Sequence, residues 1–170
     1  MQETVEQYKQ RIMGHLGDQD PLRVQSKTAG KIERLVKRVP LGRLRKRPAP
    51  GKWSVVEILA HLADDEIVTG YRMRSILGAP GTPIAAFDQD KWAEAENYAK
   101  HDPKMSLRVF ATVREANLAL LKLLRAEQWK HFGVHAERGE ESIERIAQMM
   151  AGHDINHLRQ IEAILTAKKK

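Results

Sequence analysis

The sequence contains no cysteine among its 170 residues. Disulfide bonds, thiolate metal sites and cysteine nucleophiles are therefore excluded, and a reducing compartment is compatible with this composition. No apolar run approaches the roughly 20 residues that a membrane-spanning helix needs. The first ten residues, MQETVEQYKQ, are too polar for a secretory signal. We therefore expect a cytoplasmic protein that has no membrane partner.

Aromatic residues make up only 5% of the chain, and no stretch shows the sustained apolar–polar alternation of a half-buried strand. Hydrophobic residues make up 42% and charged residues 30%, which is ordinary for a soluble globular protein. A chain of this length buries about 70% of its unfolded surface. We expect one domain over residues 1–170, with residues 168–170 as a frayed tail.

Glycine and proline divide the chain into segments with helical periodicity. The predicted helices cover about residues 3–16, 21–39, 54–77, 103–126 and 142–167, with a short helical segment within 88–99. The second helix is expected to weaken near Gly30, and residues 131–139 to be irregular rather than part of a sheet. The pattern predicts an all-α fold, a four-helix bundle with an additional short helix.

Helix ends are marked by specific residues. Asp20-Pro21 has the form of an N-cap followed by proline at the first helical position. Ser54 and Glu57 have the spacing of a capping box, in which each side chain accepts a hydrogen bond from the other's backbone N–H. Gly17 is expected to terminate the first helix.

Positive charge is concentrated in residues 21–52. This segment holds 11 of the 29 Lys and Arg residues and only one of the 22 acids, Glu33, so it carries +10 while the rest sums to −3. Such a segment can bind phosphate or nucleic acid. No aromatic residue is interleaved to stack on bases, so a solvated connection is favoured over a nucleic-acid contact.

The sequence His153-Asp154-Ile155-Asn156-His157 places two histidines four residues apart, on one face of a predicted helix. Two imidazoles in this arrangement can chelate one divalent ion. The zinc-protease signature requires Glu directly after the first histidine. Here Asp154 takes that position, which disfavours protease chemistry and leaves a solvated carboxylate as the simple expectation.

His61 lies in the middle of the helix predicted over 54–77, among residues expected to face the core. A single histidine there is more often a hydrogen-bonded core residue than a metal ligand. If this helix packs beside the last one, however, His61 completes a set of three histidines. Three protein ligands with open positions are the arrangement of a catalytic metal site.

The segment PGKWSVVEILAHLADDE (residues 50–66), followed far downstream by HDINHLRQI (residues 153–161), resembles the DinB-like superfamily, which includes YfiT-like metal-dependent hydrolases and thiol transferases. The resemblance implies a four-helix bundle, often dimeric, with a divalent metal near one end of the helices. Matched by position, the metal ligands are His61, His153 and His157. Nickel and zinc are the metals that the resemblance suggests.

The open metal site leaves two reactions as alternatives. A water on the ion can ionise near pH 7 and attack a carbonyl, or the ion can bind the thiolate of a low-molecular-weight thiol cosubstrate. In both cases the partner is a small molecule. Two other classes remain open: a stress-associated nucleic-acid-binding protein that uses residues 21–52, and a non-catalytic metal-binding protein.

Several further residues have competing interpretations. Glu57, Asp65 and Gln160 lie one turn from the histidines and either orient them or make ordinary helix hydrogen bonds. His135 either reaches the open metal face or lies in a loop, with the loop favoured. Trp92 and Tyr98 either line a pocket or pack in the interior, with packing favoured. No spacing argument connects the remaining histidines, His15, His101 and His131, to the site.

Overall fold

The computed structural model describes residues 3–167, so the predicted tail at 168–170 lies outside the described residues. Its long helices are α1 (Val5–Leu16), α2 (Pro21–Val36), α4 (Val55–Gly78), α6 (Pro103–Lys122) and α7 (Ile143–Thr166). Shorter helical elements are α3 (Leu41–Leu44), α5 (Gln89–Ala95), η1 (Tyr98–Lys100) and η2 (Gln128–Lys130). The all-α prediction and the predicted order of helices are confirmed.

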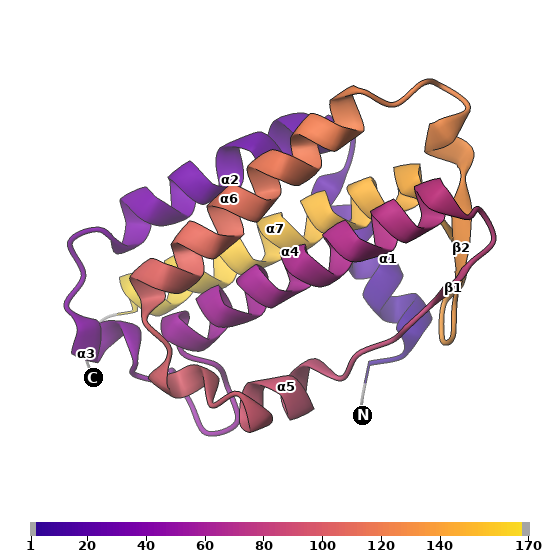
Figure 1. Ribbon diagram of the computed structural model, residues 1–170. Coiled ribbons are helices and arrows are strands. Elements are labelled where there is room, and N and C mark those ends of the chain that lie inside the picture. The colour runs from indigo at the N-terminus through magenta and orange to yellow at the C-terminus, as the bar shows by residue number, and fades with distance from the viewer. Residues whose placement is uncertain (1–2, 168–170) are drawn as a thin grey trace.

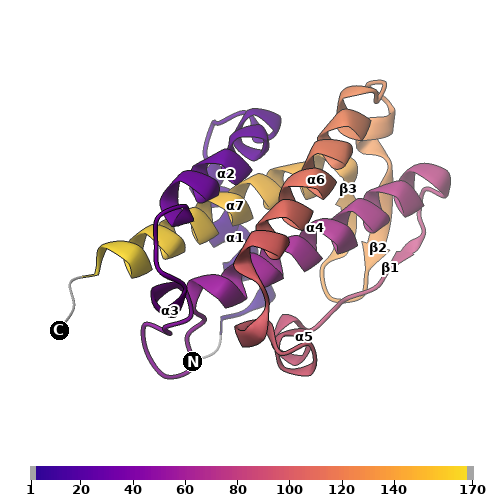
Figure 2. The ribbon, with the colours of Figure 1, turned by 60° about the vertical axis from the view of Figure 1, so that its left-hand side comes forward.

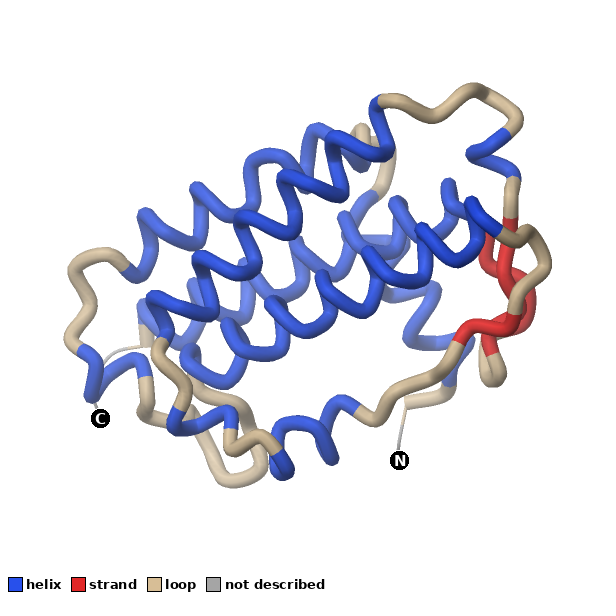
Figure 3. The backbone as a smooth tube through the Cα atoms, in the orientation of Figure 1, coloured by secondary structure: helices blue, strands red, loops and turns tan. Residues whose placement is uncertain are grey.

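Helices α2, α4, α6 and α7 form the four-helix bundle (Figure 1). Helix α4 packs on α6 and α7, α2 packs on α6 and α7, and α1 lies against α7 on the outside of the bundle (Figure 2). The segment that contains α5 leaves the end of α4 and returns along the bundle to α6 (Figure 3). Helices α1, α4, α5 and α7 therefore lie around the same side of the bundle.

The predicted helix starts are confirmed. Ser54 accepts a hydrogen bond from the Glu57 N–H, and the Glu57 carboxylate accepts one from the Ser54 N–H at 2.8 Å. Asp20 caps α2, which begins at Pro21, and Gly17 ends α1 with a positive φ of 54°. Because the capping box begins α4 at Val55, His61 falls in the second turn of a buried helix.

Two sequence predictions are wrong. Helix α2 continues through Gly30, because a single glycine costs only about 1 kcal/mol and the surrounding turns bury Val24, Thr28 and Ile32. The helix predicted over residues 103–126 also ends early, since α6 stops at Lys122 instead of near residue 126.

The prediction that residues 131–139 exclude a sheet is also wrong. Strand β2 (Phe132–His135) pairs in parallel with β1 (Pro83–Ile84) and antiparallel with β3 (Gly139–Ser142). These strands of two to four residues are too short to show apolar–polar alternation. Gly133 allows the close pairing, because a Cβ at this position would lie 2.6 Å from the Ile84 side chain.

The hydrophobic core follows the bundle axis and includes Ile58, Leu62 and Phe110 near the start of α4, and Met73, Ile76 and Ile146 near its other end. Among residues 3–167, no helix combines the length and the apolar character that crossing a membrane requires. The core leaves a short stretch of the α4–α7 contact to polar side chains, and the three histidines lie there.

Candidate metal centre

Three histidine side chains converge between α4 and α7. The Nε2 atom of His153 lies 3.0 Å from Nε2 of His61 and 3.0 Å from Nε2 of His157. All three rings are buried, and one ring nitrogen from each lies within 4.8 Å of the others. His61 comes from α4, whereas His153 and His157 occupy consecutive turns of α7. The predicted cluster is therefore present as a geometric unit.

The convergence suits a cation better than a set of hydrogen bonds among the rings. Each neutral imidazole carries only one N–H, and the Nδ1 atoms of all three rings lack a hydrogen-bond partner in the described structure. Two nitrogens about 2.0–2.1 Å from a common zinc ion lie roughly 3–3.4 Å apart. The Nε2 separations at His153 fall at the lower end of that range.

The protonation states also suit a metal. Burial, with a smaller contribution from His153, lowers the pKa of His61 to about 4. Burial and the two neighbouring rings hold the pKa of His157 well below its usual value. These two rings are therefore neutral at pH 7, and neutral imidazole is the form that ligates metal. The residues fit a divalent ion held by three nitrogen ligands.

Residues one turn from the histidines have different roles. The Asp65 carboxylate lies 3.5 Å from Nδ1 of His153, on the side of the ring away from the cluster. The Glu57 carboxylate instead accepts hydrogen bonds from Ser54 and Arg47, so it caps α4 and pairs with a surface guanidinium. Gln160 lines a small cavity together with His157. Asp65 lies beside His153, and Gln160 is close enough to His157 to raise its pKa, whereas Glu57 contacts none of the three histidines.

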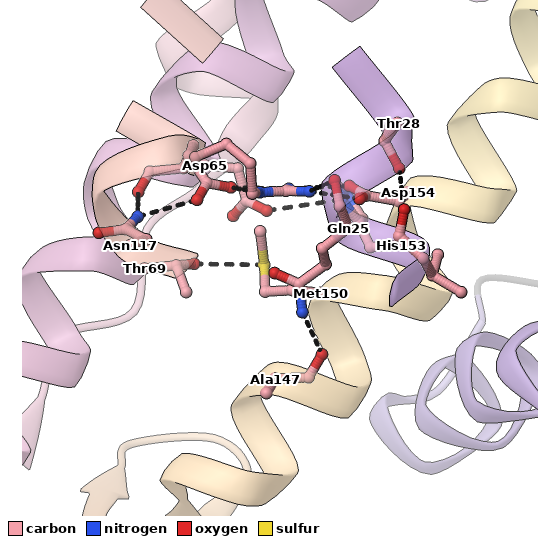
Figure 4. A network of polar contacts seen from close by, with 12 residues as sticks. Gln25, Thr28, Asp65, Thr69, Asn117, Ala147, Met150, His153 and Asp154 are labelled. Carbon is pink, nitrogen blue, oxygen red and sulfur yellow. Dashed lines mark hydrogen bonds and ion pairs between the residues drawn. The ribbon is translucent and has the colours of Figure 1, made fainter. Parts of the chain in front are cut away.

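A buried ionic network lies beside the histidines and joins four helices. Asp154 is fully buried and accepts hydrogen bonds from Arg114 at 2.5 and 3.0 Å, so the expectation that it is solvated is wrong. Arg114 also pairs with Glu66, and Asn117 donates to Glu66 at 2.8 Å. Figure 4 shows His153 and Asp154 side by side, with Asp154 facing this network. The network fixes the turn of α7 that carries His153.

A large cavity of about 840 Å³ opens on His61 and His153. One wall follows a single face of α4, where Asp65, Thr69 and Arg72 succeed His61. The rest comes from α7, α1, the α5 segment and the β2–β3 hairpin. A smaller cavity of about 230 Å³ reaches His153 and His157 from the other side. The cluster is therefore accessible to a small molecule although its rings are buried.

His135 lies on β2, is buried and lines the large cavity, but it does not belong to the three-histidine cluster. The interpretation of His135 as a loop residue is thus wrong. His15, His101 and His131 do not line either of the two cavities.

The predicted packing role of Tyr98 is confirmed, because its ring is fully buried and its hydroxyl donates to Asp64. Trp92 packs against the ring of Phe87, with the two ring centroids 4.9 Å apart. Neither residue lines the two cavities described above.

Tyr8 and Arg72 line the large cavity, and the sequence analysis did not identify either as a site residue. Tyr8 belongs to the apolar stripe of the first helix, so only the packing of α1 on α7 reveals it. Burial, with a contribution from Asp65, raises the pKa of Tyr8 to about 12, so its hydroxyl keeps its proton. Arg72 follows His61 by 11 residues, which is three turns on one helix face. That periodicity could have identified it.

The basic residues of 21–52 are all exposed and distributed over α2, α3 and the following loop. Arg47 pairs with Glu57, and Arg43 donates to the Leu165 carbonyl. Lys52 lines the smaller cavity. The segment therefore lies mainly on the outside of the bundle, and its proposed contact with nucleic acid stays a prediction.

Comparison with known proteins identifies relatives of this arrangement. The family model described as "DinB superfamily" matches residues 26–161. A protein of Oceanobacillus iheyensis and YfiT of Bacillus subtilis, both named "Putative metal-dependent hydrolase", are 27% and 26% identical to this chain. The first alignment covers 72% of this chain and 70% of the relative, and the second covers 65% and 63%.

Two solved structures share the fold. YfiT from Bacillus subtilis, described as "a probable metal-dependent hydrolase with an unusual four-helix bundle topology", superposes with a TM-score of 0.79 and 22% identity. That match covers 95% of this chain and 87% of YfiT. A mycothiol-dependent maleylpyruvate isomerase gives a TM-score of 0.65 and 12% identity, covering 88% of this chain and 62% of the isomerase.

Proposed function

The chain belongs to the DinB superfamily, and from this premise we propose that it is an enzyme that acts on a small molecule with the help of a divalent metal ion. The proposed ligands are His61, His153 and His157, and the proposed metal is nickel or zinc. The observation that carries the proposal is the convergence of their Nε2 atoms at 3.0 Å, in buried rings whose Nδ1 atoms have no partner in the described structure.

A divalent ion bound by three neutral imidazoles keeps its full charge and acts as a Lewis acid toward water, a thiol or a substrate oxygen. The chain supplies the surroundings of that chemistry. The Asp65 carboxylate lies 3.5 Å from Nδ1 of His153 without forming a hydrogen bond in this structure, and its charge favours a proton on Nδ1, the tautomer that leaves Nε2 free. Trp53 packs against the His61 ring, with the ring centroids 5.0 Å apart, and excludes water on that side.

Tyr8 contributes a hydroxyl at the point where the two cavities meet, since it lines both of them. Its proton is retained at neutral pH because the pKa is raised to about 12. In this position the hydroxyl can donate a hydrogen bond to a substrate oxygen, and a developing negative charge would strengthen that bond. We therefore assign to Tyr8 the positioning of the substrate's electrophilic group.

The reaction is proposed as hydrolysis, with transfer of a thiol as the second candidate. The names of the relatives, metal-dependent hydrolases, support hydrolysis. The structural similarity to a mycothiol-dependent isomerase supports a thiol cosubstrate. The chain itself has no cysteine, so any thiol would come from a low-molecular-weight cosubstrate.

The first experiment is the metal content of untagged protein, measured by mass spectrometry. We expect nearly one nickel or zinc ion per chain, and loss of that ion in both His61→Ala and the His153→Ala/His157→Ala double variant. The matched control is His15→Ala, which removes a half-buried histidine outside the cavities. No ion in wild-type protein after incubation with either metal would refute the proposal.

The second experiment separates catalysis from metal storage. Metal-loaded protein is screened for hydrolysis of ester and amide panels and for transfer of small thiols to electrophiles. Turnover that disappears in His153→Ala supports the enzyme, whereas metal binding without turnover supports a non-catalytic metal protein. Steeply salt-dependent binding of nucleic acid, lost when Arg45, Lys46 and Arg47 are neutralised, would support the remaining alternative. Dimer formation and a cytoplasmic location stay predictions.

A further inference from the structure

Arg72 is a buried cation without a carboxylate partner. Only 8% of the residue is exposed, and no ion pair found among residues 3–167 includes it. Its Nη2 donates to the Ala85 carbonyl at 2.5 Å, whereas Nε is buried and has no partner in the described structure. The guanidinium also lies 5.7 Å from the centroid of the Phe87 ring, a cation–π contact that offsets part of the cost of burial. Since a guanidinium stays charged at any physiological pH, the remaining cost favours an anion beside it.

The other cations of the large cavity are already compensated. Arg138 donates to both carboxylate oxygens of Glu141, at 2.7 and 2.8 Å. Lys91 has a side chain that is 82% exposed, and it lies 3.5 Å from Asp88. Of these three cations in the cavity wall, Arg72 is the one that is both buried and outside any ion pair.

No carboxylate of the cavity forms an ion pair with Arg72 in the described structure, although Asp65 and Glu141 act on its charge from a greater distance. Glu141 is paired with Arg138, Asp88 caps α5, and Asp65 lies beside His153. The remaining acids that line the cavity, Asp90, Glu94 and Glu137, are exposed. The deep part of the cavity near Arg72 is therefore suited to a negatively charged group.

A second donor lies at the same end of the cavity. His135 is buried, and its Nδ1 accepts a hydrogen bond from the Glu137 N–H at 3.1 Å. A neutral imidazole with this bond carries its proton on Nε2, which makes Nε2 a donor. The sheet brings His135 to Arg72, because Ile84 pairs with His135 in β1–β2 and the next residue, Ala85, accepts from Arg72.

We propose that Arg72, assisted by His135, binds an oxyanion of the substrate, a carboxylate or a phosphate, at one end of the large cavity. Arginine with two free N–H directions matches the geometry of both groups. The proposal names the substrate class of the proposed enzyme and rests on that function for the role of the three histidines. The binding of the anion itself depends only on Arg72 and His135.

The distance along α4 determines which part of the substrate is bound. Arg72 follows His61 by 11 residues, a rise of roughly 16 Å along the helix. The Arg72 guanidinium donates to the Ala85 carbonyl, whereas His61 meets the histidines of α7, so we place the bound oxyanion away from the group that reacts at the histidines. The substrate is an anionic small molecule whose reacting atom lies several bonds from its charged end, and Thr69 and Met150 line the cavity between the two ends.

The test compares probes that share a short alkyl chain and differ in the charge and type of the head group. Ligand-observed NMR titrations with hexanoate, hexyl phosphate and the neutral hexanamide give relative affinities for the protein as purified. We expect at least one anion to bind about tenfold more tightly than hexanamide, a difference of about 1.4 kcal/mol. The tighter of the two anions identifies the oxyanion as carboxylate or phosphate.

The variants assign that preference to Arg72. Arg72→Met keeps an unbranched apolar stem but removes the guanidinium, and it should reduce the preference to less than about twofold, whereas Arg72→Lys should retain part of it. Lys91→Met, which removes an exposed cation from the same cavity, should leave the preference unchanged. Equal binding of all three probes to wild-type protein, or full preference in Arg72→Met, would overturn the proposal.

Cobalt(II) titration, followed by visible absorption, makes the two proposals separable. Cobalt uptake without anion preference refutes the Arg72 site and leaves the metal centre intact. Anion preference without cobalt uptake refutes the metal centre and leaves an oxyanion-binding cavity. Thermal unfolding of each variant verifies that it folds, and Arg72→Lys provides the charge-preserving comparison if Arg72→Met does not.

Discussion

Arg114 and Asp154 form an ion pair that is almost completely excluded from solvent, one residue along α7 from His153. The same guanidinium pairs with Glu66 of α4, so a single side chain of α6 neutralises two buried carboxylates from the helices that carry the histidines. Asn117 adds a donor to Glu66. The relative position of α4 and α7 at the cluster is thereby fixed by polar contacts as well as by packing.

Replacing Arg114 with Met should lower the free energy of unfolding by about 3–5 kcal/mol, because it leaves two carboxylates buried without a counterion. Urea unfolding measures this loss. The control is Arg125→Met, which removes an exposed guanidinium paired with Glu127 and should cost less than about 1 kcal/mol. Equal losses in the two variants would mean that burial adds nothing to the pair.

Gly152 permits the close contact of α1 with α7. A Cβ at this position would lie 2.1 Å from the Ile12 carbonyl oxygen, which is backbone and cannot rotate away. Gly152→Ala should therefore displace α1 and lower stability by about 1–3 kcal/mol. Because α1 carries Tyr8, metal-dependent turnover should fall further than stability alone explains.

The control for Gly152→Ala is Gly14→Ala. Gly14 lies within α1, and a Cβ there would meet no atom within 4 Å. This substitution should stabilise the protein by about 0.5–1 kcal/mol, since alanine favours helix. Thermal unfolding of the two variants should thus move in opposite directions.

Saturating nickel or zinc should raise the thermal midpoint of wild-type protein. A ligand at 100 times its dissociation constant contributes about 2.7 kcal/mol. For a domain of this size, that corresponds to roughly 5–10 °C. The shift should vanish with a chelator and in His157→Ala, and should persist in His15→Ala.

Asp65→Asn should weaken metal binding by about 10–100-fold while retaining the ligands.

Glu57 should give acid-dependent stability. Burial raises the pKa of Glu57, but hydrogen bonds from Arg47 and Ser54 outweigh this effect and hold it below the usual value. The folded-state pKa is thus below the unfolded one, so the contribution is complete above the unfolded pKa near 4.5 and is lost as the pH falls through the folded value. Glu57→Gln keeps an acceptor for the Ser54 N–H but removes the charge that pairs with Arg47, and it should cost about 0.5–1 kcal/mol at pH 7.

Urea unfolding between pH 7 and pH 3 tests this prediction. The difference between Glu57→Gln and wild type should shrink as the pH falls, because the wild-type carboxyl becomes protonated. Glu162→Gln, at an exposed position on α7, is the matched control and should follow wild type. A constant difference across the range would refute the role of the ionised carboxylate.

Much of the fold could be predicted from local signals. The caps at Asp20 and Ser54 and the apolar periodicity of the long helices depend on residues within a few turns. The β1–β2–β3 sheet could not be predicted from local signals, because β1 and β2 pair across about 50 residues of sequence. Gly133 is required because the Ile84 side chain lies against it, and that contact is not apparent from the local sequence.

The candidate site divides in the same way. Spacing identified His153 and His157 as a pair. The position of His61 in a predicted core-facing helix made it a third candidate, and the family resemblance assigned all three as ligands. Asp154 was misinterpreted because its partner, Arg114, lies 40 residues away on another helix. Tyr8 and Arg72 were missed because they lie on different helices. Only the packing of these helices shows that both side chains line the same cavity.

The histidines that meet at the cluster are far apart in the chain, since 92 residues separate His61 from His153. At a synthesis rate of about 5–20 residues per second, His61 leaves the ribosome roughly 5–20 seconds before its partners. An isolated imidazole holds a divalent ion poorly, so the nascent chain has no means of retaining metal during that interval. Metal uptake at the proposed site would therefore follow the synthesis of both helices, and the ion inserted there would be selected after translation.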